Sequence, residues 1–152
     1  MNFADTTALV AQYNEQFAKI TQEFRAQMQN LISNVFVEFF KVEPHVQAIS
    51  WCQYTPYFND GEECIFGVQD VYFILEGLNV ENVPDSPYEF EDDEQYVVAE
   101  KYGSDEEAYT ENMKLLENLI IANSDIMKYA YGDHVMVVIT PTETITNEFE
   151  HE

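Results

Sequence analysis

Carboxylates dominate the chemistry that this sequence can offer, and they gather in one segment. Residues 85–111 hold 11 acidic residues and a single base, Lys101. Such a run is most often a solvated surface, but carboxylates are also the ligands that Ca²⁺ and Mg²⁺ prefer. An EF-hand loop needs a glycine turn at a fixed spacing from its acids, and the run from Glu89 to Glu94 has none. We therefore expect no specific metal site and no cofactor.

The acidic segment also resembles nucleic acid in its charge. DNA carries one negative charge per about 1.7 Å of its axis, and closely spaced carboxylates on a folded face can occupy a DNA-binding groove of another protein. Ordinary protein surfaces mix both signs, whereas this segment does not. We expect it to bind a basic partner, with aromatic residues as anchors among the charges. The expected partner-binding residues are Glu89, Glu91, Asp92, Asp93, Glu94, Asp105, Glu106, Glu107 and Glu111, with Tyr88, Phe90 and Tyr109.

Signals for catalysis are nearly absent. The sequence has no Gly-x-x-x-x-Gly-Lys, no Gly-x-Ser-x-Gly and no His-Glu-x-x-His motif. Asp133 and His134 could join a cysteine in a site, but a capping or solvent-facing histidine is more common. Arg25 is the only arginine, so bidentate recognition of a phosphorylated substrate is hard to build. We expect no enzyme, and a carboxylate-based metal-binding protein or enzyme is the least favoured alternative.

The net charge of the whole chain is extreme. It is −23 over 152 residues, with 46% hydrophobic and 14% aromatic residues. Disordered chains combine high charge with few aromatic residues, so this chain is expected to fold as a single domain, 1–152. Its surface would repel nucleic acid and anionic membranes, which excludes both as direct partners. A partner protein and adaptation to a saline habitat both remain open as explanations of the charge.

Residues 5–40 are predicted to form one long helix within a segment 1–40, capped by Asp5. Its apolar residues repeat every 11 positions, about 3.67 per turn, and 36 residues would span about 54 Å, more than the roughly 40 Å of a globule of this size. The helix either breaks near Ser33 and Asn34 or extends past the domain to meet a second copy. We expect a two-fold homodimer through Leu9, Tyr13, Phe17, Ile20, Phe24 and Met28, a stripe that continues to Leu31, Val35 and Phe39.

A β-hairpin is predicted over residues 47–75, with strands at 47–58 and 63–75 on either side of the turn Asn59-Asp60-Gly61. Both faces of its strands carry large apolar residues, so both are expected to be at least partly covered. In this register Cys52 and Cys64 lie about four residues apart along the strands, too far for a disulfide. Both are therefore expected to be thiols. Together with the lack of an export signal, this favours a cytoplasmic protein.

The remaining elements complete an α+β fold: a long N-terminal helix and a C-terminal helix packed on a small, mostly antiparallel sheet. Strands are expected at 133–140 and 143–149, with an edge strand at 95–100. A capping box that starts at Ser104 is predicted to open a helix that kinks near residues 123–125. The residues expected to point inward from this helix are Met113, Leu116, Leu119 and Ile120.

The string from Trp51 to Val68 supplies one resemblance. Its core reads Trp-x-Gln-Tyr-Thr-Pro-Tyr-Phe-Asn-Asp-Gly and resembles uncharacterised small proteins of bacteriophages and prophages, which often place it behind a long N-terminal helix. The resemblance implies a phage setting, hence the cytoplasm of an infected bacterium. With the charge, it leads to the hypothesis of a phage-encoded acidic inhibitor that imitates nucleic acid and binds a basic host protein, such as a defence nuclease or its complex. The alternative is an acidic assembly protein that docks through its helix face without mimicry.

Overall fold

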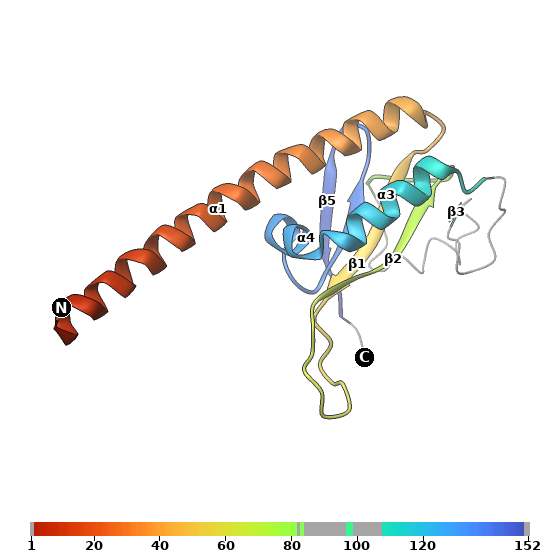
Figure 1. Ribbon diagram of the computed structural model, residues 1–152. Coiled ribbons are helices and arrows are strands. Elements are labelled where there is room, and N and C mark those ends of the chain that lie inside the picture. The colour runs from red at the N-terminus through yellow and green to blue at the C-terminus, as the bar shows by residue number, and fades with distance from the viewer. Residues whose placement is uncertain (1, 82, 84–96, 99–107, 151–152) are drawn as a thin grey trace.

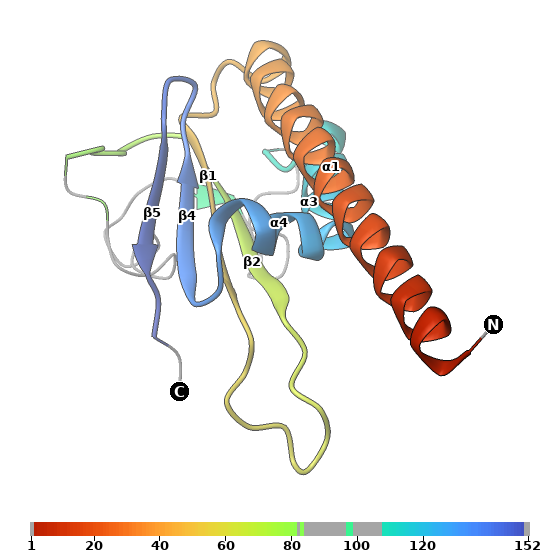
Figure 2. The same cartoon turned by 90° about the vertical axis from the view of Figure 1, so that its left-hand side faces the viewer.

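Five strands form one antiparallel sheet in the order β3-β2-β1-β4-β5 within the residues that the structure describes. The computed structural model describes residues 2–81, 83, 97–98 and 108–150. Figures 1 and 2 show the described helices on one face of this sheet. The α+β prediction is confirmed. The elements are α1 (Phe3–Val42), β1 (Ala48–Tyr54), β2 (Gly67–Ile74), β3 (Val97–Val98), α3 (Glu111–Ala122), α4 (Ser124–Tyr131), β4 (Val135–Ile139) and β5 (Thr144–Glu148).

Helix α1 is continuous over 40 residues and extends far beyond the sheet (Figure 1). Its N-cap is Asn2, whose side chain accepts a hydrogen bond from the Asp5 backbone N–H at 2.8 Å, so the prediction of Asp5 as the cap was wrong. The predicted alternative of a break near Ser33 and Asn34 was also wrong. Both residues are exposed and lie between the buried Ile32 and Phe36, so tertiary packing holds the helix on either side of them.

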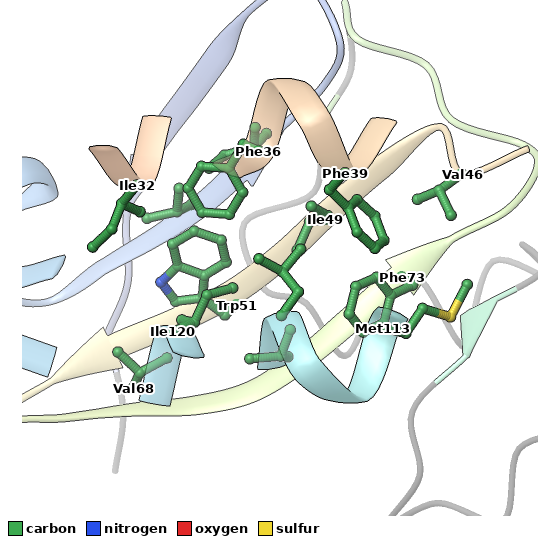
Figure 3. Packing of buried hydrophobic residues seen from close by; sticks show 14 of the residues in the cluster. Ile32, Phe36, Phe39, Val46, Ile49, Trp51, Val68, Phe73, Met113 and Ile120 are labelled. Atoms are coloured by element: carbon green, nitrogen blue, oxygen red, sulfur yellow. The ribbon is translucent and has the colours of Figure 1, made fainter. Parts of the chain in front are cut away.

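The main core lies between the sheet and the helices. The Trp51 side chain of β1 is fully buried there, stacked on Phe36 of α1 with 6.0 Å between ring centroids. Figure 3 shows these two rings with Ile49 and Phe73 from the sheet between the helices. The inward positions predicted for α3 are confirmed, since Met113, Leu116 and Ile120 are buried in this cluster and Leu119 packs against it.

A second apolar cluster covers the opposite face of the sheet. It contains Cys52 and Met136 from neighbouring central strands, and Phe149, which follows β5, packs onto it. Tyr54 contacts Phe149 with ring centroids 5.6 Å apart. All residues of β1 from Ala48 to Gln53 are buried. The prediction that both faces of this hairpin are at least partly covered is confirmed.

The hairpin strands end well before the turn. Tyr54 pairs with Gly67, the last register pair of β1 and β2, so the predicted strand segments 55–58 and 63–66 are a long projecting loop instead (Figure 1). The turn itself is as predicted: Asp60 and Gly61 have φ of 47° and 85°, as a type I′ turn requires, and the Glu62 N–H donates to the Asn59 carbonyl at 2.8 Å. Cys52 and Cys64 are both thiols, as expected.

The C-terminal helical region begins later than predicted. Thr110 caps α3 by accepting from the Met113 N–H at 3.2 Å, and its extended backbone rules out a continuous helix from Ser104, which itself lies outside the described residues. The Thr110 hydroxyl donates to the buried carboxylate of Glu43 at 2.8 Å, which ties the start of α3 to the end of α1. The predicted interruption is confirmed, with Asn123 between α3 and α4.

Strands β4 and β5 lie within the ranges predicted for them, and β3 forms the expected sheet edge. The part of the predicted edge strand that the structure describes is Val97–Val98, with Val98 fully buried. The remainder, including Tyr96, lies outside the described residues.

Candidate interaction surfaces

Most of the residues expected to bind a partner lie outside the described part of the chain. Within it, Glu111 is exposed in the first turn of α3. Tyr109 is half-buried: its ring lies 6.4 Å from that of Phe73, and its hydroxyl donates to the Glu117 carboxylate. The residues outside the described part are Tyr88, Glu89, Phe90, Glu91, Asp92, Asp93, Glu94, Asp105, Glu106 and Glu107.

Most of the described Lys and Arg side chains form ion pairs with carboxylates of the same chain. Three of the five described Lys and Arg residues contact an acid: Arg25 with Asp125 at 3.2 Å, Lys41 with Glu38 at 3.0 Å and Lys128 with Asp133 at 4.0 Å. Acidic residues, by contrast, are exposed on the projecting loop, after β2 and along β5. These exposed acids are Asp60, Glu62, Glu63, Glu76, Glu81, Glu143, Glu148 and Glu150.

Charge is divided unequally between α1 and the rest of the chain. Helix α1 contains four acids and three bases, a net charge of −1. All other residues contain 25 acids and three bases, a net charge of −22. The long helix is therefore almost neutral, and the anionic character belongs to everything that follows it.

The first part of α1 packs against no other described part of the chain. We call residues 3–24 the arm; all of its side chains except Thr21 are exposed, and Figures 1 and 2 show it leading away from the sheet. It carries large apolar side chains on the predicted stripe, among them Phe17 at 72% and Ile20 at 64% exposure. Soluble proteins rarely leave a contiguous apolar patch of this kind uncovered. The exposed apolar residues of the arm are Phe3, Leu9, Val10, Tyr13, Phe17, Ile20 and Phe24.

The arm leaves the domain at Arg25. The Arg25 guanidinium donates two hydrogen bonds to the Asp125 carboxylate of α4, at 3.2 and 3.3 Å, and its centre lies 6.0 Å from the Tyr129 ring centroid. A bidentate pair fixes direction as well as distance. The direction of the arm is therefore set by contacts with α4.

An apolar groove continues the stripe beyond this point. It lies between the second half of α1 and α3, has a volume of about 490 Å³, and is bounded by Leu31 and Val42 on one side and Leu115 on the other, which are 59%, 60% and 68% exposed. Val35 and Phe39, which belong to the predicted stripe, also line it. The uncovered surface of the arm and the groove are thus one continuous apolar strip.

Polar side chains of the hairpin string serve mainly to anchor the loop. Gln53 is fully buried; its Nε2 donates to the carbonyls of Met127 and Gly132 at 2.9 and 2.7 Å, and its Oε1 accepts from Trp51 Nε1 at 2.9 Å. This side chain joins β1 to the corner between α4 and β4. Of the aromatic residues of the string, Trp51 belongs to the core, whereas Tyr57 and Phe58 are 68% and 77% exposed on the loop.

Asp133 is a structural anchor in the same region. Its carboxylate accepts from the Thr55 N–H at 2.8 Å and from the Thr55 hydroxyl at 2.6 Å, and the His134 N–H adds a third bond. Burial raises the pKa of Asp133, but the hydrogen bonds from Thr55 and the charge of His134 outweigh it, so the net pKa is below the ordinary value. The His134 ring stacks on Tyr57 with centroids 5.0 Å apart. These contacts occupy both residues in holding the loop.

Comparison with known proteins leaves the function to be argued from these surfaces. No protein family, curated protein or solved structure matches this chain. Within the described ranges, no cluster of three or more His, Cys, Asp and Glu side chains is arranged to hold a metal ion. Among the described helices, none is both long and apolar enough to cross a membrane.

The groove is the feature that sequence reasoning missed. Its α1 side belongs to the predicted stripe, but its α3 side depends on where α3 packs. One signal was present: Leu115 and Leu116 are adjacent, and their side chains leave the helix about 100° apart, so a helix that buries one can expose the other. Leu116 is 3% exposed and Leu115 is 68% exposed, so Leu115 marks an apolar surface of α3 that faces away from the core.

Proposed function

We propose that this protein is an acidic inhibitor that binds a basic, nucleic-acid-binding protein in the place of nucleic acid. The observation that carries this proposal is the net charge of −22 on the residues outside α1, attached to a folded α+β scaffold. The resemblance of the string from Trp51 to Val68 to phage proteins supports a phage setting. The partner is then a host protein of the infected bacterium, with defence nucleases and their complexes as the first candidates.

Electrostatics explains how such a surface would act. A basic groove that evolved for phosphates is strongly attracted to a dense anionic face, and this attraction speeds encounter and penalises wrong partners. The scarcity of bases means that few positive charges on the protein's own surface would repel the groove. The carboxylates act here as fixed charges and not as acids, bases or metal ligands, so the proposed function requires no cofactor and no catalysis.

Competition with nucleic acid is the decisive experiment. A basic protein captured from bacterial lysate on the full chain, and eluted with rising salt, is purified and tested for binding in the presence of unlabelled duplex and single strands. Nucleic acid is expected to displace the inhibitor, and added salt to weaken the complex. A partner that binds both at once with undiminished affinity would refute mimicry.

Charge reversal locates the binding face. Changing Asp92, Asp93 and Glu94 to Lys is expected to weaken binding by at least ~100-fold, because several charge pairs would be replaced by repulsion. The matched control changes Asp5, Glu15 and Glu23 of α1 to Lys, which alters the net charge equally and is expected to cost under ~10-fold. The control should keep its stability, because its three charges are exposed and contribute little to it, and circular dichroism checks that both variants are folded. Equal losses for both variants would show that total charge, and no particular face, determines binding.

A second candidate function is favoured by the uncovered arm. If mimicry fails, the protein is better described as an acidic assembly protein that docks through the helix face, with the charge setting only the encounter rate. The exposed stripe on α1 supports this candidate. The two candidates use different surfaces, so variants in the arm and variants in residues 92–94 separate them.

A further inference from the structure

We propose that the uncovered strip is filled by a second copy of this chain, with the two α1 helices antiparallel and the arm of each copy seated in the groove of the other. This goes beyond a simple dimer, because each copy completes the apolar surface between α1 and α3 of its partner. The pairing requires no basic target protein, since its contacts come only from α1 and α3.

The stripe itself has the symmetry that an antiparallel pair requires. When the two-fold axis passes near Ile20, Leu9 of one copy lies opposite Leu31 of the other, and Phe17 lies opposite Phe24. Tyr13 then lies opposite Met28, so each large residue of the stripe from Leu9 to Leu31 meets another. The repeat of about 3.67 residues per turn keeps these contacts on one side of a nearly straight helix.

The same register brings the start of the arm to the groove. Residues 3–10 of one copy lie opposite residues 31–38 of the other, which include the groove-lining Leu31 and Val35. Phe3, Leu9 and Val10 are 85%, 36% and 54% exposed in the single chain. The arm therefore supplies apolar side chains at the height of the partner groove.

Charge selects the antiparallel arrangement over the parallel one. A parallel pair would bring two bodies of net charge −22 side by side. In the antiparallel pair, the points at which α1 enters the two cores, near Ile32, are separated by about 36 Å along the helix axis. This is several times the Debye length of about 10 Å at 0.1 M salt.

The exposed area is sufficient for a stable pair. At about 200 Å² for each aromatic side chain, the exposed fractions of Phe3, Tyr13, Phe17 and Phe24 correspond to about 550 Å². The aliphatic residues of the arm and the groove add to this. A standard interface buries about 800 Å² per partner, so the strip reaches that size without help from the sheet or the projecting loop.

Mass and distance measurements on the full chain test the arrangement. Sedimentation at micromolar concentration is expected to give twice the chain mass of 17.7 kDa. For the distance, a spin label is placed on Ala4→Cys, which lies on the exposed back of the arm, in a Cys64→Ser background, while the buried Cys52 stays unlabelled. The antiparallel pair predicts a label separation of about 50 Å, whereas a parallel pair predicts less than about 30 Å.

Matched variants test the two halves of the strip. Phe17→Glu, which inserts a charge into the seam of both copies, is expected to raise the dissociation constant by about 100-fold or more. Its control, Gln22→Glu, adds the same charge on the opposite face of α1 and is expected to leave assembly within about 3-fold. Leu115→Glu is expected to weaken the pair by about 10-fold or more through the groove. Its control Asn118→Glu lies on α3 outside the groove.

Several results would overturn the proposal. A mass of 17.7 kDa at all micromolar concentrations, including a chain that stays monomeric and binds only a different protein, would remove the second copy. A short label separation would replace the antiparallel pair with a parallel one. Identical assembly of Leu115→Glu and Asn118→Glu would show that the groove stays open. Because Phe17 and Leu115 are exposed in the single chain, the variants are expected to fold, and circular dichroism checks this.

Discussion

Substituting Gln53 by Met is predicted to destabilise the protein strongly, although the two side chains have similar length. Gln53 is fully buried and makes three hydrogen bonds, with Trp51 Nε1 and with the carbonyls of Met127 and Gly132. The Met thioether accepts a hydrogen bond from Trp51 Nε1 only weakly, and it has no N–H to donate to the two carbonyls. The substitution therefore leaves buried polar groups without partners.

The size of the loss follows from those groups. A buried polar group that loses its partner costs about 1–3 kcal/mol, and three groups are affected. The Met127 carbonyl lies within α4, where helical hydrogen bonding compensates it in part. We therefore expect the free energy of unfolding to fall by about 3–5 kcal/mol, a large part of the roughly 5–15 kcal/mol of a typical domain.

Urea denaturation measures this loss directly. Trp51 is the only tryptophan and is fully buried, so its fluorescence reports unfolding of the core. Parent and variant must be compared at one protein concentration, because assembly would shift the transition. With a slope near 2 kcal/mol per molar urea, the midpoint is expected to fall by about 1.5–2.5 M.

The matched control is Gln47→Met. Gln47 is exposed just before β1, and its side chain accepts a single hydrogen bond from the Leu78 N–H at 3.2 Å. Water can replace that bond, so the expected loss is below about 1 kcal/mol. If Gln53→Met costs no more than Gln47→Met, the bridge from β1 to the α4–β4 corner does not stabilise the fold and the reasoning is refuted.

Two further predictions concern the same part of the sheet. Asp133→Asn is expected to lower the free energy of unfolding by about 1–2 kcal/mol at pH 7, because Thr55 loses a charged acceptor. The pKa of Asp133 is depressed in the folded protein, so the stability that the Asp133 carboxylate contributes is present above the ordinary pKa of 3.8 and is lost as the pH falls through the folded pKa. The free energies of unfolding of parent and variant should therefore converge between pH 7 and pH 2. A constant difference between them would contradict this. Thiol titration should find that Cys64, which is partly exposed, reacts in the native protein, whereas Cys52, which is buried, reacts only in denaturant. Equal rates for both thiols would show that the second face of the sheet is open.

Most helices and turns of this fold could be predicted from the sequence because residues close together in the chain determine them. The 11-residue repeat predicted α1, and Asp60-Gly61 predicted the turn because only that dipeptide in the segment suits two consecutive positive φ angles. The ends of elements were predicted less well, since distant residues decide them. Strand β1 ends at Tyr54 because Thr55 bonds to Asp133, 78 positions away.

The start of α3 was missed for a similar reason. The residues that precede Glu111 include a capping box at Ser104, and local rules favoured it. Thr110 caps the helix instead, and its hydroxyl also bonds to the Glu43 carboxylate, 67 positions away. The candidate surfaces divide in the same way: the stripe on α1 follows from its own repeat, whereas the groove requires α3 to be placed beside it.

The unequal division of charge gives the molecule an electrical direction. In the single chain, an almost neutral helix is attached to a body of net charge −22, so the negative charge lies to one side of the molecular centre. The electric field of a basic target exerts a torque on this charge distribution and turns the charged body toward the target before contact. This raises the fraction of collisions that are productive. The arm then points away from the target. Pairing through α1 would use the arm and the groove beside α3, whereas the exposed acids of the projecting loop and of β5 lie on other surfaces, so capture of a basic target would not compete with pairing for those acids.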